Sequence, residues 1–381
     1  MYMPRKIFNE DHEQFRTAFR SFVEKEIVPN QEQWEKDGIV DRNLWLKAGE
    51  NGFLVPMAEE KYGGLGIGDH RFDVVMCEEL ARVNERGFML GLHNMVVAPY
   101  LLSYANNEQK QRLLSRCITG EAILAVGMTE PGAGSDLAGM RTTAVEKDDH
   151  WLLNGSKIFI SNGILSDIIV VAAKTNLDNP HEMGLFLVER GMEGFSRGEP
   201  LKKMGMKSQD TAELFFDNVK VPKANVLGDP GKGFVYMMEK LPVERLNLCI
   251  DAVASARTAL DLTKEYIKER KAFGQAVSKF QNTRFKMAEM KTEIDLGFAY
   301  VDRMIDQVNE GTLSAADACG GKYWTSEMLC RVVDECLQLH GGYGFMDEYL
   351  ISKMYRDVRI SRIYAGTNEI MKTVIAKAMD L

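Results

Sequence analysis

The sequence lacks several features that would assign it to a specialised class of protein. Among its 381 residues there is no Cys-x-x-Cys pair, no run of 18 apolar residues, and no basic-then-apolar leader within residues 1–9. With only six cysteines, this pattern predicts free thiols in a reducing compartment and a cytoplasmic protein, as in a bacterial-type cytosol, without a membrane span. The 47 Lys and Arg are fewer than the 55 Asp and Glu, and the net charge of −8 argues against nucleic acid as a partner.

Motifs for several kinds of chemistry are also missing. The six histidines form neither HxxxH nor HExxH, so no metal site is predicted. The absence of GxSxG argues against a serine acyl transferase, and the absence of GxxxxGK[ST] argues against a P-loop nucleotide triphosphatase. No GxGxxG lies in a strand–helix–strand pattern, which argues against a Rossmann dinucleotide site.

What is present predicts an α+β protein of three domains. Residues 1–121 have mainly helical patterns, residues 122–230 have short strands separated by Gly, Asn and Pro, and residues 231–381 have long helices. Strands without helices between them predict an antiparallel sandwich or barrel, and the long helices predict a four-helix bundle. The 22 methionines favour either adaptable core packing or a pocket for a long apolar ligand.

Local signals place the first helix and the main bundle helix. Phe15, Phe19 and Phe22 recur at helical spacing, with Asn9 or Asp11 as the cap and a predicted end at Pro29. The bundle helix, expected to end at Gly311, carries a stripe with steps of three and four residues: Met287, Met290, Ile294, Gly297, Val301 and Met304. Further helices are expected near residues 314–339, 348–360 and 369–379.

Two breaks are predicted from proline and from a tight-turn dipeptide. The helical stretch over residues 70–116 is expected to be interrupted around Pro99. Residues 151–160 are expected to form two strands that turn at Asn154-Gly155, the dipeptide favoured in tight hairpins.

Four short strings are candidate binding sites, and each also has a purely structural interpretation. Residues 129–136 (TEPGAGSD) present backbone amides and hydroxyls to a ligand or form a turn between strands. Residues 338–344 (QLHGGYG) approach a phosphate or ring or simply end a helix, and residues 364–369 (YAGTNE) bind an anion or cap a helix through Thr367 or Asn368. Residues 270–275 (RKAFGQ) are a basic string that also suits a helix end.

In combination and order, these strings resemble those of the acyl-CoA dehydrogenase family. MTEPGAGSD, LNGSKIFISNG, RKAFG, QLHGGYG and IYAGTNEI follow one another across about 240 residues, which is far more specific than any one of them. The resemblance implies the acyl-CoA dehydrogenase fold, bound FAD, and a homotetramer, a dimer of dimers that packs through the bundle.

The resemblance also implies which residues contact cofactor and substrate. Those expected to line flavin and pantetheine are Met128, Thr129, Gly134 and Ser135, and those expected to flank the isoalloxazine ring are Phe159, Ile160 and Ser161. Those expected to reach the cofactor diphosphate or adenine of a neighbouring subunit are Arg270, Phe273, Gln281, Gln338, Gly341 and Gly342. Thr367 and Glu369 are expected at the flavin diphosphate, and the expected substrate contacts are Ser135, Arg245, Tyr364, Ala365 and Gly366.

The chain departs from the family's pattern at one position. Many members carry the catalytic glutamate in Tyr-Glu-Gly-Thr, where this chain has Ala365, which cannot accept a proton. Isovaleryl-CoA and long-chain members carry their glutamate on an earlier helix, and Glu244 with Arg245 matches that Glu-Arg pattern. Because Pro242 suggests a helix start there, the helix dipole is expected to favour the Glu244 carboxylate, and desolvation to raise its pKa.

The resemblance implies an oxidoreductase of fatty acid β-oxidation that converts a saturated acyl-CoA into a trans-2-enoyl-CoA. Glu244 would remove the α-proton, the β-hydrogen would leave as hydride to flavin N5, and electron-transferring flavoprotein would accept the electrons. Two alternatives stay open: a catalytically silent acyl-CoA-binding member, which Ala365 suggests, and a flavin-dependent oxidase, which the length of the chain disfavours. Residues 91–100 are expected to form part of the floor of the acyl pocket, whose preferred chain length the sequence leaves open.

Overall fold

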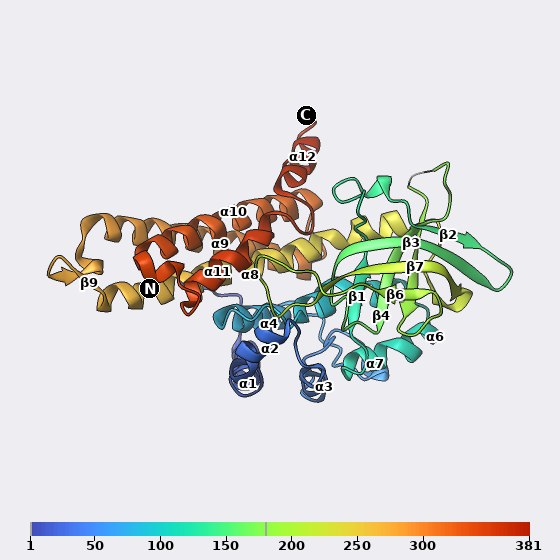
Figure 1. The fold of residues 1–381 in the computed structure, drawn as a ribbon, viewed down its shortest axis with the longest axis horizontal. Coiled ribbons are helices and arrows are strands. Elements are labelled where there is room, and N and C mark those ends of the chain that lie inside the picture. Colours follow the sequence, from blue (N-terminus) through green and yellow to red (C-terminus); the bar gives the residue numbers. More distant parts are fainter. Residues whose placement is uncertain (1, 180) are drawn as a thin grey trace.

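The computed structural model describes residues 2–179 and 181–381, and its first part is helical (Figure 1). α1 (Glu10–Phe22) begins at Asn9, whose side chain accepts a hydrogen bond from the His12 N–H. A π turn (Val23–Ile27) and a 3-10 turn (Val28–Asn30) then continue the helical path into α2 (Gln31–Asp37). The predicted end at Pro29 is therefore wrong, because proline in the first turn of a new helical segment removes no hydrogen bond.

The prediction of a break at Pro99 is also wrong. The helical path breaks over residues 83–89, and Pro99 lies in the first turn of α5 (Ala98–Tyr104), a position that suits proline. The other elements of this part are α3 (Arg42–Glu50), a 3-10 turn (Glu60–Tyr62), α4 (Arg71–Arg82), a π turn (Leu92–Val97), α6 (Asn107–Gln109), a second π turn (Lys110–Leu114) and α7 (Ser115–Ile118).

The middle of the chain forms an eight-stranded sheet that is mainly antiparallel. Its path is β6-β7-β3-β2-β4-β5-β8, and β1 joins by parallel pairing with β4. The strands are β1 (Leu124–Gly127), β2 (Thr143–Glu146), β3 (His150–Ser161), β4 (Ile168–Lys174), β5 (Met183–Glu189), β6 (Phe195–Arg197), β7 (Thr211–Pro222) and β8 (Val226–Leu227). The central strands β4 and β5 are buried almost throughout, so they carry apolar runs instead of alternating patterns.

The hairpin predicted at Asn154-Gly155 is wrong, since both residues lie inside the continuous strand β3. The turn occurs earlier, where the Lys147 N–H donates to the His150 carbonyl between β2 and β3. A β-carbon at Gly155 would lie 2.5 Å from the Thr142 hydroxyl oxygen, and the Gly155 φ is +144°. The glycine therefore permits a close approach of the segment that leads into β2, at a shift in the β3–β7 register.

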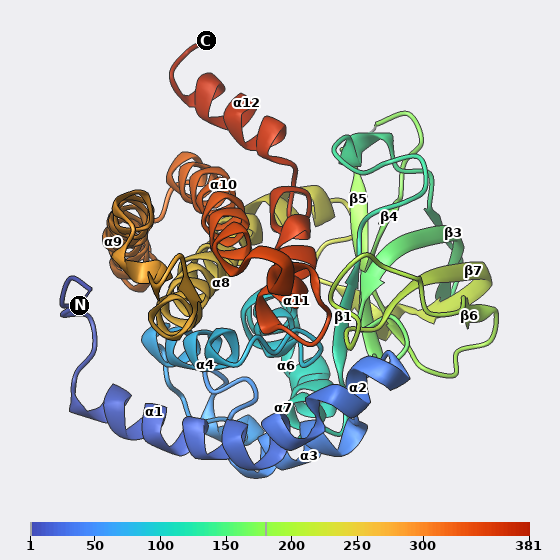
Figure 2. The same ribbon diagram turned by 60° about the vertical axis from the view of Figure 1, so that its left-hand side comes forward.

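The last part of the chain is a helical bundle beside the sheet (Figure 2). Its elements are α8 (Gly233–Glu269), the hairpin β9 (Lys271–Ala272) and β10 (Gln275–Ala276), a 3-10 turn (Val277–Lys279), α9 (Gln281–Asn309), α10 (Ala315–His340), α11 (Leu350–Val358) and α12 (Asn368–Ala378). Figure 2 shows α8, α9 and α10 side by side, whereas α12 projects away from them. Met290, Ile294, Val301 and Met304 of the predicted stripe are buried, which confirms the bundle helix.

A single helix, α8, connects the sheet to the far end of the bundle (Figure 1). At its start, a β-carbon on Gly233 would lie 2.7 Å from the Met183 carbonyl oxygen of β5. At its end, Arg270 leads directly into the β9–β10 hairpin. With 37 residues, α8 is about 55 Å long.

The carboxylate of Asp357 on α11 ties the three parts of the chain together. It accepts hydrogen bonds from the Met206 backbone N–H, in the loop before β7, and from the Asn84 amide, which follows α4. Asp357 is buried, so both bonds are protected from water.

Two further expectations concern membranes and thiols. None of the helices within residues 2–179 and 181–381 is long and apolar enough to cross a membrane. The six cysteines are free, as predicted, and four of them are buried: Cys117, Cys249, Cys319 and Cys336.

Candidate active site

The loop over residues 128–136 is attached to β3 by its backbone. The Ile158 N–H donates to the Thr129 carbonyl at 2.9 Å. Glu130 and Ala133 exchange backbone hydrogen bonds of 3.0 and 3.1 Å around the Pro131-Gly132 turn. Gly134 and Ser135 follow on the exposed side of this turn. The string is thus both a tight turn, its structural interpretation, and an exposed surface of amides and hydroxyls next to β3.

A buried ion pair, which the sequence analysis did not predict, attaches this loop to β3. The Lys157 ammonium, on β3, donates to the Glu130 carboxylate at 2.8 Å and to the Met128 carbonyl at 3.1 Å. Glu130 also accepts the backbone N–H groups of Arg141 and Thr142, at 2.6 and 3.0 Å. Burial lowers the pKa of Lys157 to about 8, although Glu130 opposes this, so the ammonium remains charged at neutral pH.

A bulge in β3 turns an aromatic side chain outward beside the loop. The β3–β7 register shifts between Lys157 and Ile160, and Phe159 adopts a φ of +61° with 66% of its surface exposed. Such a backbone is uncommon for a bulky residue, which makes Phe159 a candidate functional position. Ile160, expected to flank a flavin ring, instead packs in the core of the sheet at 3% exposure, because the strand alternation resumes there. The Ile160 side chain therefore belongs to the core, and a contact of its backbone with a flavin stays a prediction.

Glu244 lies inside α8 and not at a helix start. α8 begins at Gly233 and continues through Pro242 without a break, so the expected stabilisation of the Glu244 carboxylate by a helix N-terminus is wrong. Pro242 removes one backbone hydrogen bond from α8. The helix continues nevertheless, because α4, α9 and α10 pack against α8 and stabilise it.

Burial instead sets the protonation of Glu244. Desolvation raises its pKa to about 7, against the opposing effect of the neighbouring Arg245. A carboxyl with a pKa near neutrality exchanges a proton readily at physiological pH, as general-base catalysis requires.

Arg245 and Lys322 hold the turn over residues 364–367. The Arg245 guanidinium donates to the Ala365 carbonyl at 3.5 Å and to the Cys319 sulfur at 3.3 Å. Lys322, almost fully buried on α10, donates to the Gly366 carbonyl at 2.7 Å. Both cations thus bind carbonyl groups of the turn. Within the described residues, neither forms a salt bridge with a carboxylate.

The turn itself has an unusual backbone. Ala365 and Gly366 have φ values of +52° and +92°, so an alanine occupies a conformation that favours glycine. Among the hydrogen bonds of residues 2–179 and 181–381, none uses the Ala365 N–H as donor. Thr367 caps α12 by accepting from the Ile370 N–H, as one of its two interpretations predicted. The carboxylate of Glu369 is exposed on the first turn of that helix.

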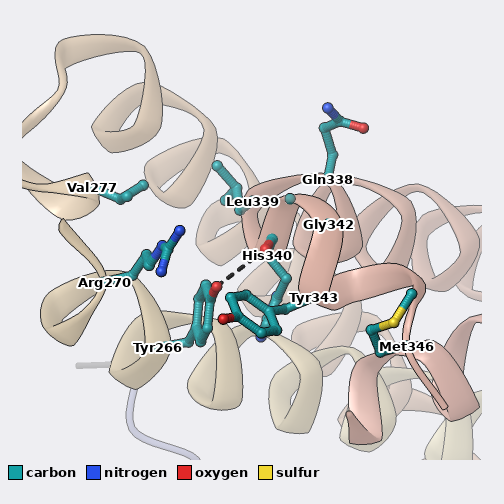
Figure 3. A pocket seen from close by; sticks show the side chains of 10 residues that line it. Tyr266, Arg270, Val277, Gln338, Leu339, His340, Gly342, Tyr343 and Met346 are labelled. Carbon is teal, nitrogen blue, oxygen red and sulfur yellow. Dashed lines mark hydrogen bonds between the residues drawn. The ribbon is translucent and has the colours of Figure 1, made fainter. Parts of the chain in front are cut away.

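A second cluster of candidate residues lies at the far end of α8. A pocket of about 520 Å³ is lined by Arg270, Gln338, Gly341 and Gly342, together with Tyr266, Val277, Leu339, His340, Tyr343 and Met346 (Figure 3). The Tyr266 hydroxyl donates to the His340 carbonyl at 3.1 Å, which fixes the base of the pocket. The structure thus brings together two of the sequence strings, residues 270–275 and residues 338–344.

Phe273 and Gln281 lie next to this pocket but do not line it. Phe273 stands at the tip of the β9–β10 hairpin, with a φ of +52° and 97% of its surface exposed. Gln281 is exposed at the first position of α9.

Most of the residues predicted to bind the cofactor therefore form two groups, one near each end of α8. The loop over residues 128–136 and Phe159 belong to the sheet, beside which α8 begins, whereas Arg270 and Gln338 line the pocket where this helix of about 55 Å ends (Figure 1). Thr367 and Glu369 lie apart from both groups, at the start of α12.

No group of three or more metal-binding side chains is found in the part of the chain that the structure describes. His93, for example, is committed to structural hydrogen bonds with the Cys117 carbonyl and the Leu124 N–H.

Comparison with known proteins finds one family along the chain. Its models match residues 9–121 (acyl-CoA dehydrogenase, N-terminal domain), residues 125–219 (middle domain) and residues 231–380 (C-terminal domain). The mitochondrial long-chain specific acyl-CoA dehydrogenase of Rattus norvegicus is 46% identical over 376 residues, which cover 98% of this chain and 87% of that protein.

Solved structures that are similar to this chain include other acyl-CoA dehydrogenases. An acyl-CoA dehydrogenase from Geobacillus kaustophilus has a TM-score of 0.97 and 51% identity, covering 99% of this chain and 100% of that one. An acyl-CoA dehydrogenase complexed with FAD from Bacillus anthracis has a TM-score of 0.91 and 32% identity, covering 98% of this chain and 68% of that one.

Removing the buried cation under the loop should destabilise the protein. Lys157→Met leaves the Glu130 carboxylate buried without its partner, at a cost of about 3–5 kcal/mol. We expect a lower thermal midpoint in calorimetry and faster proteolysis within residues 128–136. The double variant Lys157→Met/Glu130→Gln removes both charges and should recover most of the stability. A single variant as stable as the unmodified protein would contradict a structural role for the pair.

Proposed function

The chain belongs to the acyl-CoA dehydrogenase family, and on that premise we propose that it dehydrogenates a saturated acyl-CoA at Cα and Cβ with Glu244 as the base. Members of this family are FAD-dependent oxidoreductases, and this chain is an oxidoreductase of that kind. The observation that carries the proposal is the half-buried position of Glu244, where desolvation raises its pKa to about 7, next to Arg245, the cation that holds the Ala365 turn.

The residues present fit FAD. Phe159 offers an exposed aromatic surface beside the hydroxyl of Ser161 and the open amides around Gly134, which suits a planar ring with polar edges. Arg270 and Gln338 supply a guanidinium and an amide to a pocket with exposed glycines, which suits a diphosphate. When bound, FAD supplies an acceptor, at N5, for the hydrogen that leaves Cβ with its electron pair.

We assign the chain's own residues the following roles. Ionised Glu244 accepts the α-proton, and the bonding electrons move toward the thioester carbonyl. The Ala365 N–H, which has no hydrogen-bond partner among the described residues, donates to that carbonyl oxygen and stabilises its developing negative charge. Ala365 also leaves space that a glutamate in its place would fill. Arg245 and Lys322 add positive charge beneath the same turn, which further favours the charge on the substrate.

We propose a straight long-chain acyl group as the substrate, in fatty acid β-oxidation. The support is the similarity to a long-chain specific enzyme. The electron acceptor proposed from the family resemblance is electron-transferring flavoprotein.

We further propose that two copies of the chain complete each cofactor site, within a homotetramer. The loop over residues 128–136 in one subunit would bind the flavin end, and Arg270 and Gln338 of a second subunit would bind the other end. The exposed Phe273 at the hairpin tip fits such a contact between subunits.

Replacing the proposed base should abolish reduction without loss of cofactor. We expect Glu244→Gln to remain yellow but to reduce its flavin about 10²–10⁴-fold more slowly when mixed anaerobically with acyl-CoA. In the unmodified enzyme the rate should fall as the pH drops through about 7, because the base becomes protonated. Glu239→Gln is the matched control, since that carboxylate on the same helix is bonded to Tyr104.

A Glu244→Gln enzyme that reduces its flavin at the unmodified rate would refute the assignment of the base. A flavin that no acyl-CoA reduces in the unmodified enzyme would instead favour a silent acyl-CoA-binding protein. Release of hydrogen peroxide during turnover in air would favour an oxidase.

A panel of substrates tests the proposed chain length. Unbranched acyl-CoAs from butyryl-CoA to stearoyl-CoA, with isovaleryl-CoA as the branched member, are compared by the rate of flavin bleaching. We expect the highest kcat/KM for the long chains. A maximum at butyryl-CoA or isovaleryl-CoA would contradict the proposed substrate while leaving the reaction intact.

The far pocket can be tested through cofactor affinity. Arg270→Ala removes the guanidinium proposed for the diphosphate and should weaken FAD binding by about 10- to 100-fold, measured by flavin release on dilution. Lys271→Ala removes an adjacent exposed cation that does not line the pocket and should leave the affinity unchanged. Equal effects of the two variants would argue for a general charge effect.

A further inference from the structure

Tyr100 on α5 has a buried hydroxyl group without a partner. Its side chain has 0% exposure, and the hydroxyl oxygen forms no hydrogen bond within the described residues. A buried hydroxyl without a partner destabilises the fold, so its presence in a native structure needs an explanation. Tyr100 is therefore a group whose hydrogen bond is missing from the resting fold.

The register between α5 and α8 brings Tyr100 to Glu244. The two helices run antiparallel: the Tyr104 hydroxyl donates to Glu239, and the Lys240 ammonium donates to the Ser103 hydroxyl at 2.7 Å. One turn further along each helix, Tyr100 on α5 comes opposite Glu244 on α8. Beyond this point, a β-carbon on Gly91 would lie 2.7 Å from the Asn247 side-chain oxygen, so the two segments remain in contact.

The other polar groups around Glu244 already have partners. On α8, Lys240 is bonded to Ser103, and Arg245 contacts Ala365 and Cys319. On α5, Tyr104 is bonded to Glu239. From α10, Lys322 donates to Gly366 and Asn368.

The remaining titratable groups nearby are also engaged elsewhere. Both ring nitrogens of His93, in the π turn before α5, are used by backbone groups. The charges of Asp251 and Arg86 act on the pKa of Tyr364. Among the tyrosines near Glu244, Tyr100 has a hydroxyl that is both buried and without a hydrogen-bond partner in the described residues.

We propose that Tyr100 is a positioning residue that donates its hydroxyl hydrogen to the ionised Glu244 carboxylate, orienting the base and favouring its charged form. This inference rests on the proposed role of Glu244. Burial, together with the nearby Glu244 charge, raises the pKa of Tyr100 well above its usual value, so the phenol remains a protonated donor. No proton is transferred from Tyr100: the α-proton of the substrate goes to Glu244, and the phenol keeps its own.

The hydrogen bond would act unequally on the two forms of Glu244. It stabilises the carboxylate more than the neutral acid, because a bond to a charged acceptor is stronger. Loss of the hydroxyl should therefore raise the pKa of Glu244, whereas a residue that only fills space would alter substrate affinity without moving that pKa.

The test is the pH dependence of flavin reduction in Tyr100→Phe, which keeps the ring and removes only the hydroxyl. We expect the acid limb of the kcat profile to move upward by about one pH unit, with less change in KM. Tyr104→Phe is the matched control, because it lies on the same helix and its hydroxyl is committed to Glu239. Its acid limb should not move. Flavin content and the thermal midpoint verify that each variant is folded.

A double variant separates the inference from the proposed function. In a Glu244→Gln background, Tyr100→Phe should cause no further loss, because the charge that the hydroxyl serves is absent. An unchanged acid limb in Tyr100→Phe, or a full additional loss in the double variant, would overturn the role of Tyr100 and leave Glu244 as the base. A Glu244→Gln enzyme with normal flavin reduction would instead overturn the assignment of Glu244 as the base, on which this inference rests.

Discussion

The continuous helix α8 is the constraint on which the rest of the structure depends. Its first turn is seated against β5, its middle carries Glu244 and Arg245, and its last turn leads into the hairpin beside the far pocket. Pro242 removes one internal hydrogen bond, and yet the helix does not end there, because packing on several sides stabilises it more than one bond does. A break at Pro242 would leave the base without a fixed relation to the Ala365 turn or to α5.

Much of the fold could be predicted from local patterns, and the errors share one cause. Helical spacing located the bundle helix, and two of the candidate caps, Asn9 and Thr367, begin α1 and α12. The wrong predictions at Pro29, Pro99 and Asn154-Gly155 each took a turn-forming residue as the end of an element. In the structure, the prolines lie in first turns and the glycine allows a close contact across strands. Tertiary contacts decide between these uses, and a single sequence does not contain them.

Only part of the candidate site could be predicted from the sequence. Glu244 was identified by resemblance, but burial and not a helix start perturbs its pKa, and burial depends on α5 and α8 packing across more than 100 residues of sequence. Glu130 and Lys157 each lie inside a recognised string and were overlooked because their pairing crosses two strings. For Ile160, the string suggested a contact with the flavin, whereas the strand alternation puts its side chain in the core of the sheet. Pairing, burial and side-chain direction are the three properties that linear motifs leave undetermined.

The separation of the two cofactor-binding groups along α8 has a genetic consequence. If two copies share each site, a subunit defective at Glu244 and a subunit defective at Arg270 are each intact where the other has failed. A mixed pair would then contain one site with both defects and one site with neither. Two alleles that are inactive alone would restore part of the activity when expressed together, so complementation between alleles would report the architecture of the site.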